Sequence, residues 1–99
     1  MRARTTISDI ADVPTFMVER YLPGVSYPAF AAAARRAAAE AAAMTDELVS
    51  VRYLGSVYVP GEECSFCCFE ARDADAVREA NRRADVPFWR VVRAVVIER

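Results

Sequence analysis

The chain of 99 residues contains no histidine and no lysine, so all 13 of its basic residues are arginines. Histidine is the commonest metal-binding side chain and the one that titrates near neutral pH. Its absence excludes Ser-His and Cys-His catalytic pairs, histidine-rich metal sites and a histidine general base. Several large enzyme classes are thereby ruled out.

The chain also lacks an excess of charge and a long apolar run. Its net charge is −1 at neutral pH, which gives no electrostatic reason to expect nucleic acid as a partner. The longest apolar stretch is alanine-rich and is interrupted by Arg35, Arg36 and Glu40, so we expect no membrane-spanning segment. The N-terminus has no apolar signal-peptide core, and the odd number of cysteines favours reduced thiols. We therefore expect a cytoplasmic protein.

The remaining composition, 55% hydrophobic and 27% charged, is typical of one small folded domain. Residues 1–14 are polar and aperiodic, and we expect a flexible N-terminal arm ahead of a domain at 15–99. Alternating and helical patterns predict six elements within that domain. Strands are predicted at 15–22, 49–59, 64–70 and 90–97, and helices at 26–44 and 73–84.

Turn and capping residues mark the limits of these elements. Ser26 and Asp73 are predicted helix N-caps, because a short polar side chain can accept hydrogen bonds from the free amides of the first turn. Pro87 cannot continue the second helix. Gly55 predicts a bulge or a close backbone approach within the second strand, and the tight connection at 60–63 predicts a hairpin.

Periodicity also predicts which residues of each element are buried. The expected stripes are Phe30, Ala33, Ala34, Ala37, Ala41 and Met44 in the first helix, and Ala74, Val77, Ala80, Arg83 and Ala84 in the second. In the second strand we expect Val49, Val51, Tyr53, Gly55, Val57 and Val59 to share the more apolar face. The valine-rich last strand predicts a central strand, buried on both sides.

The order strand, helix, strand, strand, helix, strand predicts a ferredoxin-like α+β fold. Its four-stranded antiparallel sheet would carry both helices on one face and leave the other face bare. Several residues expected on that bare face are too apolar for water: Met17, Tyr21, Leu54, Tyr58 and Phe66. Such a face usually indicates a partner, so we expect a homodimer that packs sheet on sheet.

The segments MVERYLPG, VRYLGSVYV and CCFEARDADAVREANRRADVP resemble a family of small bacterial ferredoxin-like proteins, known mainly as a domain of unknown function. That family includes an actinobacterial nickel-binding protein. The resemblance implies a dimer of α+β sandwiches or barrels, and in nickel-binding members a metal ion held by histidines. Those histidines would stand near Asn81 and near 85–87, where this chain has none, so we expect no cofactor. Nickel is possible by the resemblance alone.

The candidate ligand-binding residues are Glu19, Glu70, Tyr21, Tyr58 and Asn81. A buried glutamate can accept a proton or bind a cation, whereas a strand-end ion pair is the structural alternative. An aromatic pocket would be lined by Tyr21, Tyr53, Tyr58, Phe88 and Trp89, whereas the structural alternative places these rings in the core or at the dimer interface. Asn81 is the only amide side chain in the sequence, and we expect it to be exposed.

The cysteines give little reason to expect a metal site. Cys64 and Cys67 are three residues apart on a predicted strand, so they should point to opposite faces. Either Cys67 or Cys68 is expected to be a buried apolar residue. Among positions that match the family, Cys67, Glu70 and Glu19 are the remaining metal candidates.

Two functions fit these observations. The first is a small dimeric protein that binds a ligand or a metal ion without catalytic machinery. The alternative, by fold analogy, is a dimeric α/β-barrel enzyme, a cofactor-light monooxygenase or isomerase, with a carboxylate in the sheet cleft. Such an enzyme should contain an enclosed cavity in each protomer with a converging Glu, Tyr or Asn. A binding protein should have a filled core, with its polar cluster at the dimer interface.

Overall fold

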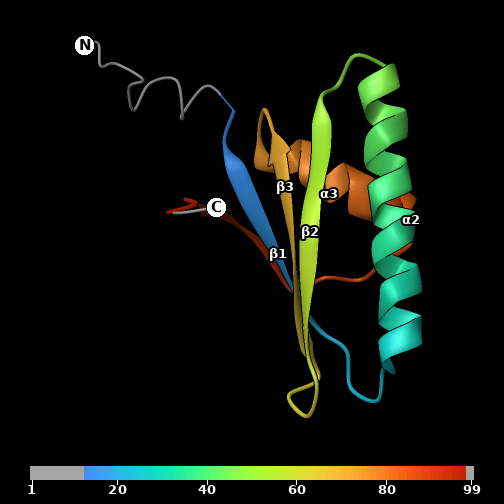
Figure 1. Cartoon of the computed structure of the whole chain (residues 1–99). Helices are drawn as coiled ribbons and strands as arrows, with labels where there is room; N and C mark the ends of the chain where they lie inside the picture. Colours follow the sequence, from blue (N-terminus) through green and yellow to red (C-terminus); the bar gives the residue numbers. More distant parts are fainter. Residues whose placement is uncertain (1–12, 98–99) are drawn as a thin grey trace.

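The computed structural model describes residues 13–97 and contains the six predicted elements in the predicted order (Figure 1). The strands are β1 Thr15–Tyr21, β2 Val51–Val59, β3 Cys64–Ala71 and β4 Arg90–Ala94, and the helices are α2 Tyr27–Asp46 and α3 Ala74–Arg83. Residues 1–12 of the predicted N-terminal arm lie outside the described residues.

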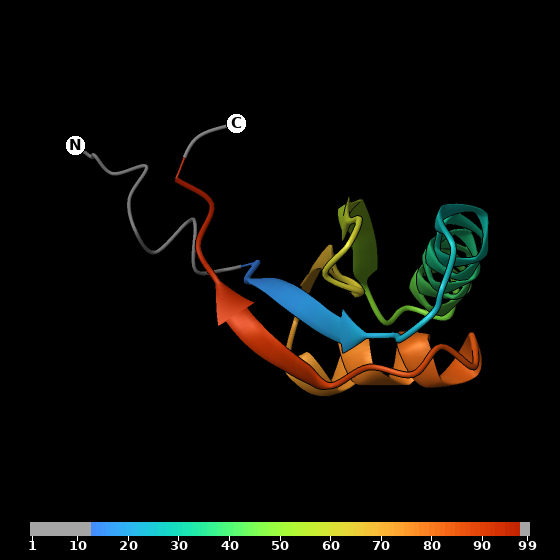
Figure 2. The same ribbon diagram turned by 90° about the horizontal axis from the view of Figure 1, so that it is seen from below.

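The four strands form one antiparallel sheet in the order β2-β3-β1-β4, and both helices lie on the same side of it (Figures 1 and 2). This is the ferredoxin-like α+β arrangement expected from the element order. The last strand differs from its prediction, because β4 is an edge strand and ends at Ala94 rather than at residue 97. Ala94 pairs with Thr15, where β1 begins, and within residues 13–97 no strand extends past Thr15 to pair with the residues after Ala94.

Local capping explains where the helices begin. The Ser26 side chain accepts a hydrogen bond from the Ala29 amide at 3.3 Å, and Asp73 accepts one from the Ala76 amide at 2.9 Å. The predicted buried stripe of α2 is confirmed at every position: Phe30, Ala33, Ala34, Ala37, Ala41 and Met44.

The predicted stripe of α3 is partly wrong. Val77, Ala80 and Ala84 are buried, together with Ala76 and Asn81, but Arg83 is exposed. The buried face of α3 is centred between Val77 and Ala80, and Arg83 lies six residues beyond Val77, on another side of the helix. There it forms ion pairs with Glu47 and Glu79.

A β-bulge in β2 decides which side chains face the helices. The register shifts between Tyr53 and Gly55, and Gly55 has a φ of 148°, which strains any other residue. Beyond the bulge, Tyr58 pairs with buried Ser65, and cross-strand partners point to the same side of a sheet. Tyr58 therefore faces the helices, and its predicted place on the bare face is wrong.

The bulge also overturns the single apolar face expected along the second strand. Val51 and Tyr53 face the helices, whereas Val57 and Val59 pair with Phe66 and Cys64 on the opposite side of the sheet. The core is filled between the sheet and the helices by side chains that include Phe16, Val18, Cys67, Phe69 and the alanines of α2. Within residues 13–97, no helix is both long enough and apolar enough to cross a bilayer.

Candidate functional site

No helix or strand among residues 13–97 covers the sheet face opposite the two helices, and we call this face the open face. Burial alternates strictly along β3, so every second residue of this strand points away from the helices. The open face includes Met17, Glu19, Tyr21, Arg52, Val57, Val59, Cys64, Phe66, Cys68, Glu70, Arg90 and Val92. Most of these side chains are apolar.

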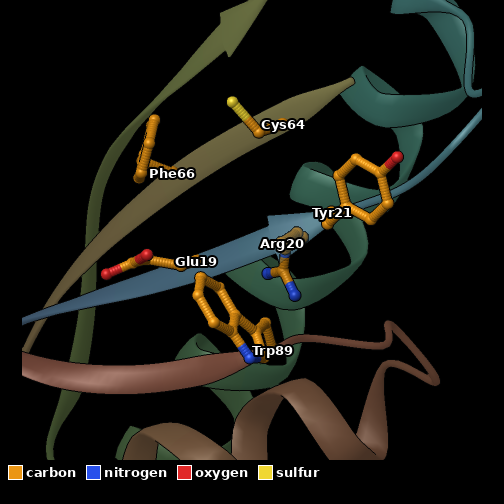
Figure 3. A pocket seen from close by; sticks show the side chains of 6 residues that line it. All are labelled: Glu19, Arg20, Tyr21, Cys64, Phe66 and Trp89. Carbon is orange, nitrogen blue, oxygen red and sulfur yellow. The ribbon is translucent and has the colours of Figure 1, made fainter. Parts of the chain in front are cut away.

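One end of the open face is hollowed into a pocket of about 490 Å³, which we call the sheet-end pocket (Figure 3). Its lining comes from the end of β1, the start of β3 and the residue before β4: Glu19, Arg20, Tyr21, Cys64, Phe66 and Trp89. Trp89 is held there because its backbone amide donates to the Glu19 carbonyl oxygen at 2.7 Å. The predicted candidates Glu19 and Tyr21 thus share one site.

The pocket is largely aromatic, and its acidic group is already paired. The Glu19 carboxylate accepts a hydrogen bond from Arg90 Nε at 3.0 Å, and the Arg90 guanidinium lies 4.9 Å from the centre of the Trp89 ring. Tyr21 and Trp89 are 61% and 70% exposed. A surface of exposed rings with a neutralised carboxylate suits contact with another apolar group.

Arg20 points the opposite way from Glu19, as Figure 3 shows, and is 1% exposed. Its guanidinium donates to Asn81 Oδ1 and to the Pro87 carbonyl oxygen, the latter at 2.9 Å. Asn81 Nδ2 in turn donates to the Val77 carbonyl oxygen at 2.8 Å. The expected exposure of Asn81 is therefore wrong: its helix position faces β1, and its amide group is buried against the guanidinium.

The Arg20 charge is balanced without a carboxylate. Among residues 13–97, none of the ion pairs involves Arg20, and its Nε has no hydrogen-bond partner. Asn81 lies in the last turn of α3, where the helix dipole and backbone carbonyls give a negative potential that favours a cation. Arg20 and Asn81 together thus tie β1 to α3.

The other glutamate candidate lies elsewhere. β1 and β3 are neighbours, as expected, but Glu19 pairs with Phe66 whereas Glu70 pairs with Thr15 at the far end of the strand. Glu70 Oε1 lies 2.6 Å from the Arg52 guanidinium. Both glutamates therefore form ion pairs with arginines, which is the structural alternative to a binding role, and they do not converge on one site.

Tyr58 and Cys67 both belong to the helix side of the sheet. The Tyr58 ring stacks on Phe30 with centroids 5.5 Å apart, and its hydroxyl donates to the Val25 carbonyl oxygen at 3.0 Å. Tyr58 also lines a smaller cavity of about 270 Å³ between α2 and β2. Cys67 is fully buried, with its Sγ 3.0 Å from Ser56 Oγ.

The thiols are distributed as the strand geometry predicted, with Cys64 on the open face and Cys67 in the core. Burial, and secondarily the neighbouring Cys67, raise the pKa of the Cys68 thiol above its usual value. Across residues 13–97, no group of three or more histidine, cysteine, aspartate or glutamate side chains is placed to hold a metal ion. The donor groups of the described chain are thus dispersed.

Sequence reasoning missed the partnership between Arg20 and Asn81. The available signal was an arginine that shares a strand face with Phe16 and Val18, because a charge on an apolar face requires a buried polar partner. It also missed that Cys64 and Phe66 join Trp89 in one pocket.

Comparison with known proteins places this geometry in a family. No curated protein matches the chain. The crystal structure of SCO4226 from Streptomyces coelicolor A3(2) is similar with a TM-score of 0.68 and 15% sequence identity, over 85% of this chain and 99% of that one. At this identity the likeness supports the fold alone. The sequence profile of the SCO4226-like nickel responsive proteins matches residues 16–93. The chain therefore belongs to the SCO4226-like family of nickel responsive proteins.

Proposed function

We propose that this protein is a homodimer, joined through its open face, that binds a small and mainly apolar ligand at the sheet-end pocket without catalysing a reaction. The observation that carries the proposal is the unpartnered apolar sheet face with a ring-lined pocket at one end. A sheet that exposes such a face in water needs cover, and a second copy of the chain is the economical cover.

The charges around the pocket favour an uncharged ligand. Glu19 is neutralised by Arg90, and the Arg20 guanidinium is buried on the other side of β1 against Asn81. A charged ligand would meet no unused counter-charge among the six lining residues, whereas Tyr21, Phe66 and Trp89 offer ring surfaces. Ligand sites are typically apolar with few polar groups, and this lining has that character.

The space between the sheet and the helices gives less support to the alternative enzyme. That space contains core side chains, and its buried polar pair, Arg20 and Asn81, is already engaged in hydrogen bonds. The carboxylates of Glu19 and Glu70 lie on the open face and form ion pairs with arginines. A general base needs a free carboxylate within reach of its substrate.

The family description names nickel, but the donor groups of this chain do not fit that ion. Imidazole is the ligand type best suited to nickel in such sites, and the sequence has no histidine. Glu19 and Glu70 stand at opposite ends of the open face. We therefore expect weak or no nickel binding, and isothermal titration calorimetry that found a tight stoichiometric site would contradict this expectation.

Two measurements test the proposal. Sedimentation velocity at micromolar concentration should find a dimer that Phe66→Arg, on the open face, converts to a monomer. Ala43→Arg, on the exposed helix side, is the matched control and should leave the dimer intact. Nile red, a neutral apolar probe, should bind the wild-type protein and bind less to Trp89→Ser. A wild-type monomer, or Nile red binding that is unchanged in Trp89→Ser, would contradict the proposal.

A further inference from the structure

The segment that follows β4 is apolar and uncovered, and we call Val95–Ile97 the C-terminal tail. Val95 and Ile97 are 70% and 88% exposed, and Val96 is also exposed. Three consecutive β-branched residues favour an extended strand, yet the ladder with β1 stops at Ala94. The tail therefore consists of strand-forming residues that pair with no strand among residues 13–97.

The tail and the sheet-end pocket lie at opposite ends of β4. The strand begins at Arg90, directly after the pocket residue Trp89, and ends at Ala94, from which the tail departs. Four residue steps of about 3.3 Å separate these ends by about 13 Å. Beyond β4 the chain turns away from the two helices, toward the side of the open face (Figure 2).

In a dimer that packs open face on open face, the direction of the two-fold axis decides whether the tail of one protomer meets the pocket of the other. The axis must then lie in the plane between the two sheets. An axis parallel to the strands would set the two pockets face to face at one end of the dimer and leave the tails, which follow the edge strands, without a pocket to cover. An axis across the strands would place each tail over the pocket of the other protomer, so both apolar features would be covered together.

We propose that the C-terminal tail of each protomer covers the sheet-end pocket of its partner and forms the missing wall of the ligand site. This inference rests on the homodimer proposed above. Aliphatic side chains of the tail lie against the rings of Tyr21, Phe66 and Trp89, which removes apolar surface from water on both sides. The ligand then binds in a cavity built by two chains, and one protomer alone holds only half of it.

The native thiol at the pocket allows a direct test by cross-linking. Val96→Cys and Ile97→Cys, made separately because adjacent residues of an extended segment point to opposite sides, place a thiol on the tail beside the partner's Cys64. Oxidation by copper phenanthroline in air should yield a covalent dimer with at least one of these variants. The band should disappear when Cys64→Ser is added. Ala43→Cys, on the exposed face of α2, is the control and should cross-link at least tenfold more slowly.

The sole tryptophan provides a second, independent readout. A stop codon in place of Val95 removes the tail without touching any residue of the sheet or helices. Trp89 emission of the truncated dimer should shift to longer wavelength, because its ring regains contact with water. A dimer by sedimentation that neither cross-links through Cys64 nor changes its emission would overturn the tail assignment alone. A wild-type monomer would overturn the homodimer and the tail assignment together.

Discussion

Glu19 and Arg20 are adjacent in β1, yet they belong to two different environments. Glu19 lies on the open face and pairs with Arg90, whose side chain is 54% exposed. Arg20 lies among the helices at 1% exposure and is bonded to Asn81 and Pro87. One peptide unit therefore separates a surface ion pair from a buried cation.

The two environments hold charge by different means. On the helix side, water cannot solvate a guanidinium, so acceptor oxygens of α3 and of the following loop take the place of water. On the open face, a carboxylate and a guanidinium meet while still partly in water, where such a pair contributes little. The helix side of the sheet thus holds its charge by buried hydrogen bonds, whereas the open face holds its charges in a partly exposed ion pair.

The largest expected effect separates two phenylalanines of β3. Phe69 is fully buried on the helix side, and Phe69→Ala should lower the free energy of unfolding by about 3–5 kcal/mol. Phe66 is half-buried on the open face, and Phe66→Ala should cost the protomer about 1 kcal/mol or less while weakening the dimer. Urea denaturation at low protein concentration, together with sedimentation, measures both effects. Equal losses of protomer stability in Phe69→Ala and Phe66→Ala would contradict the different roles assigned to the two faces.

A smaller loss is expected from breaking the buried polar pair. Asn81→Leu removes the acceptor of the Arg20 guanidinium and should lower the free energy of unfolding by about 2–3 kcal/mol. Adding Arg20→Met should restore part of this loss, because two apolar side chains leave no buried donor unpaired. A double variant that is less stable than Asn81→Leu would contradict this coupling, because Arg20 would then stabilise the fold without Asn81.

The N-cap of α3 gives a pH-dependent effect. The Ala76 amide, and to a lesser extent Arg72, hold the pKa of the Asp73 carboxyl below its usual 3.8. Because the folded pKa is the lower one, the stabilisation is complete above 3.8 and is lost as the pH falls through the folded value. Asp73→Asn keeps a capping oxygen without this titration. The thermal midpoint of wild type should exceed that of Asp73→Asn at neutral pH, and the difference should vanish in acid.

The smallest expected effect concerns the ion pair on the open face. Glu19→Gln should change the free energy of unfolding by about 0.5 kcal/mol, and added salt should reduce the difference further. Chemical denaturation at two ionic strengths measures it, with Asn81→Leu as the salt-insensitive reference. A loss above about 2 kcal/mol would mean that Glu19 behaves like a buried residue.

Local patterns predicted most of the fold. The α2 stripe followed from helical spacing of alanines, and the opposite directions of Cys64 and Cys67 followed from strand alternation. Asn81 could not be placed in this way, because its partner Arg20 is 61 residues away in the chain. Tyr58 was misplaced because the effect of the bulge on all later residues of β2 depends on pairing with β3.

The bulge at Gly55 has an evolutionary consequence. The extra residue between Tyr53 and Gly55 sets Tyr58 opposite Ser65, on the helix side, whereas unbroken pairing from Tyr53 onward would set it opposite Cys64, on the open face. A single-codon deletion at the bulge would therefore restore regular alternation and still leave Tyr58 inward. The bulge thus marks a point of β2 where the chain can lose one residue without changing the surface offered to a partner.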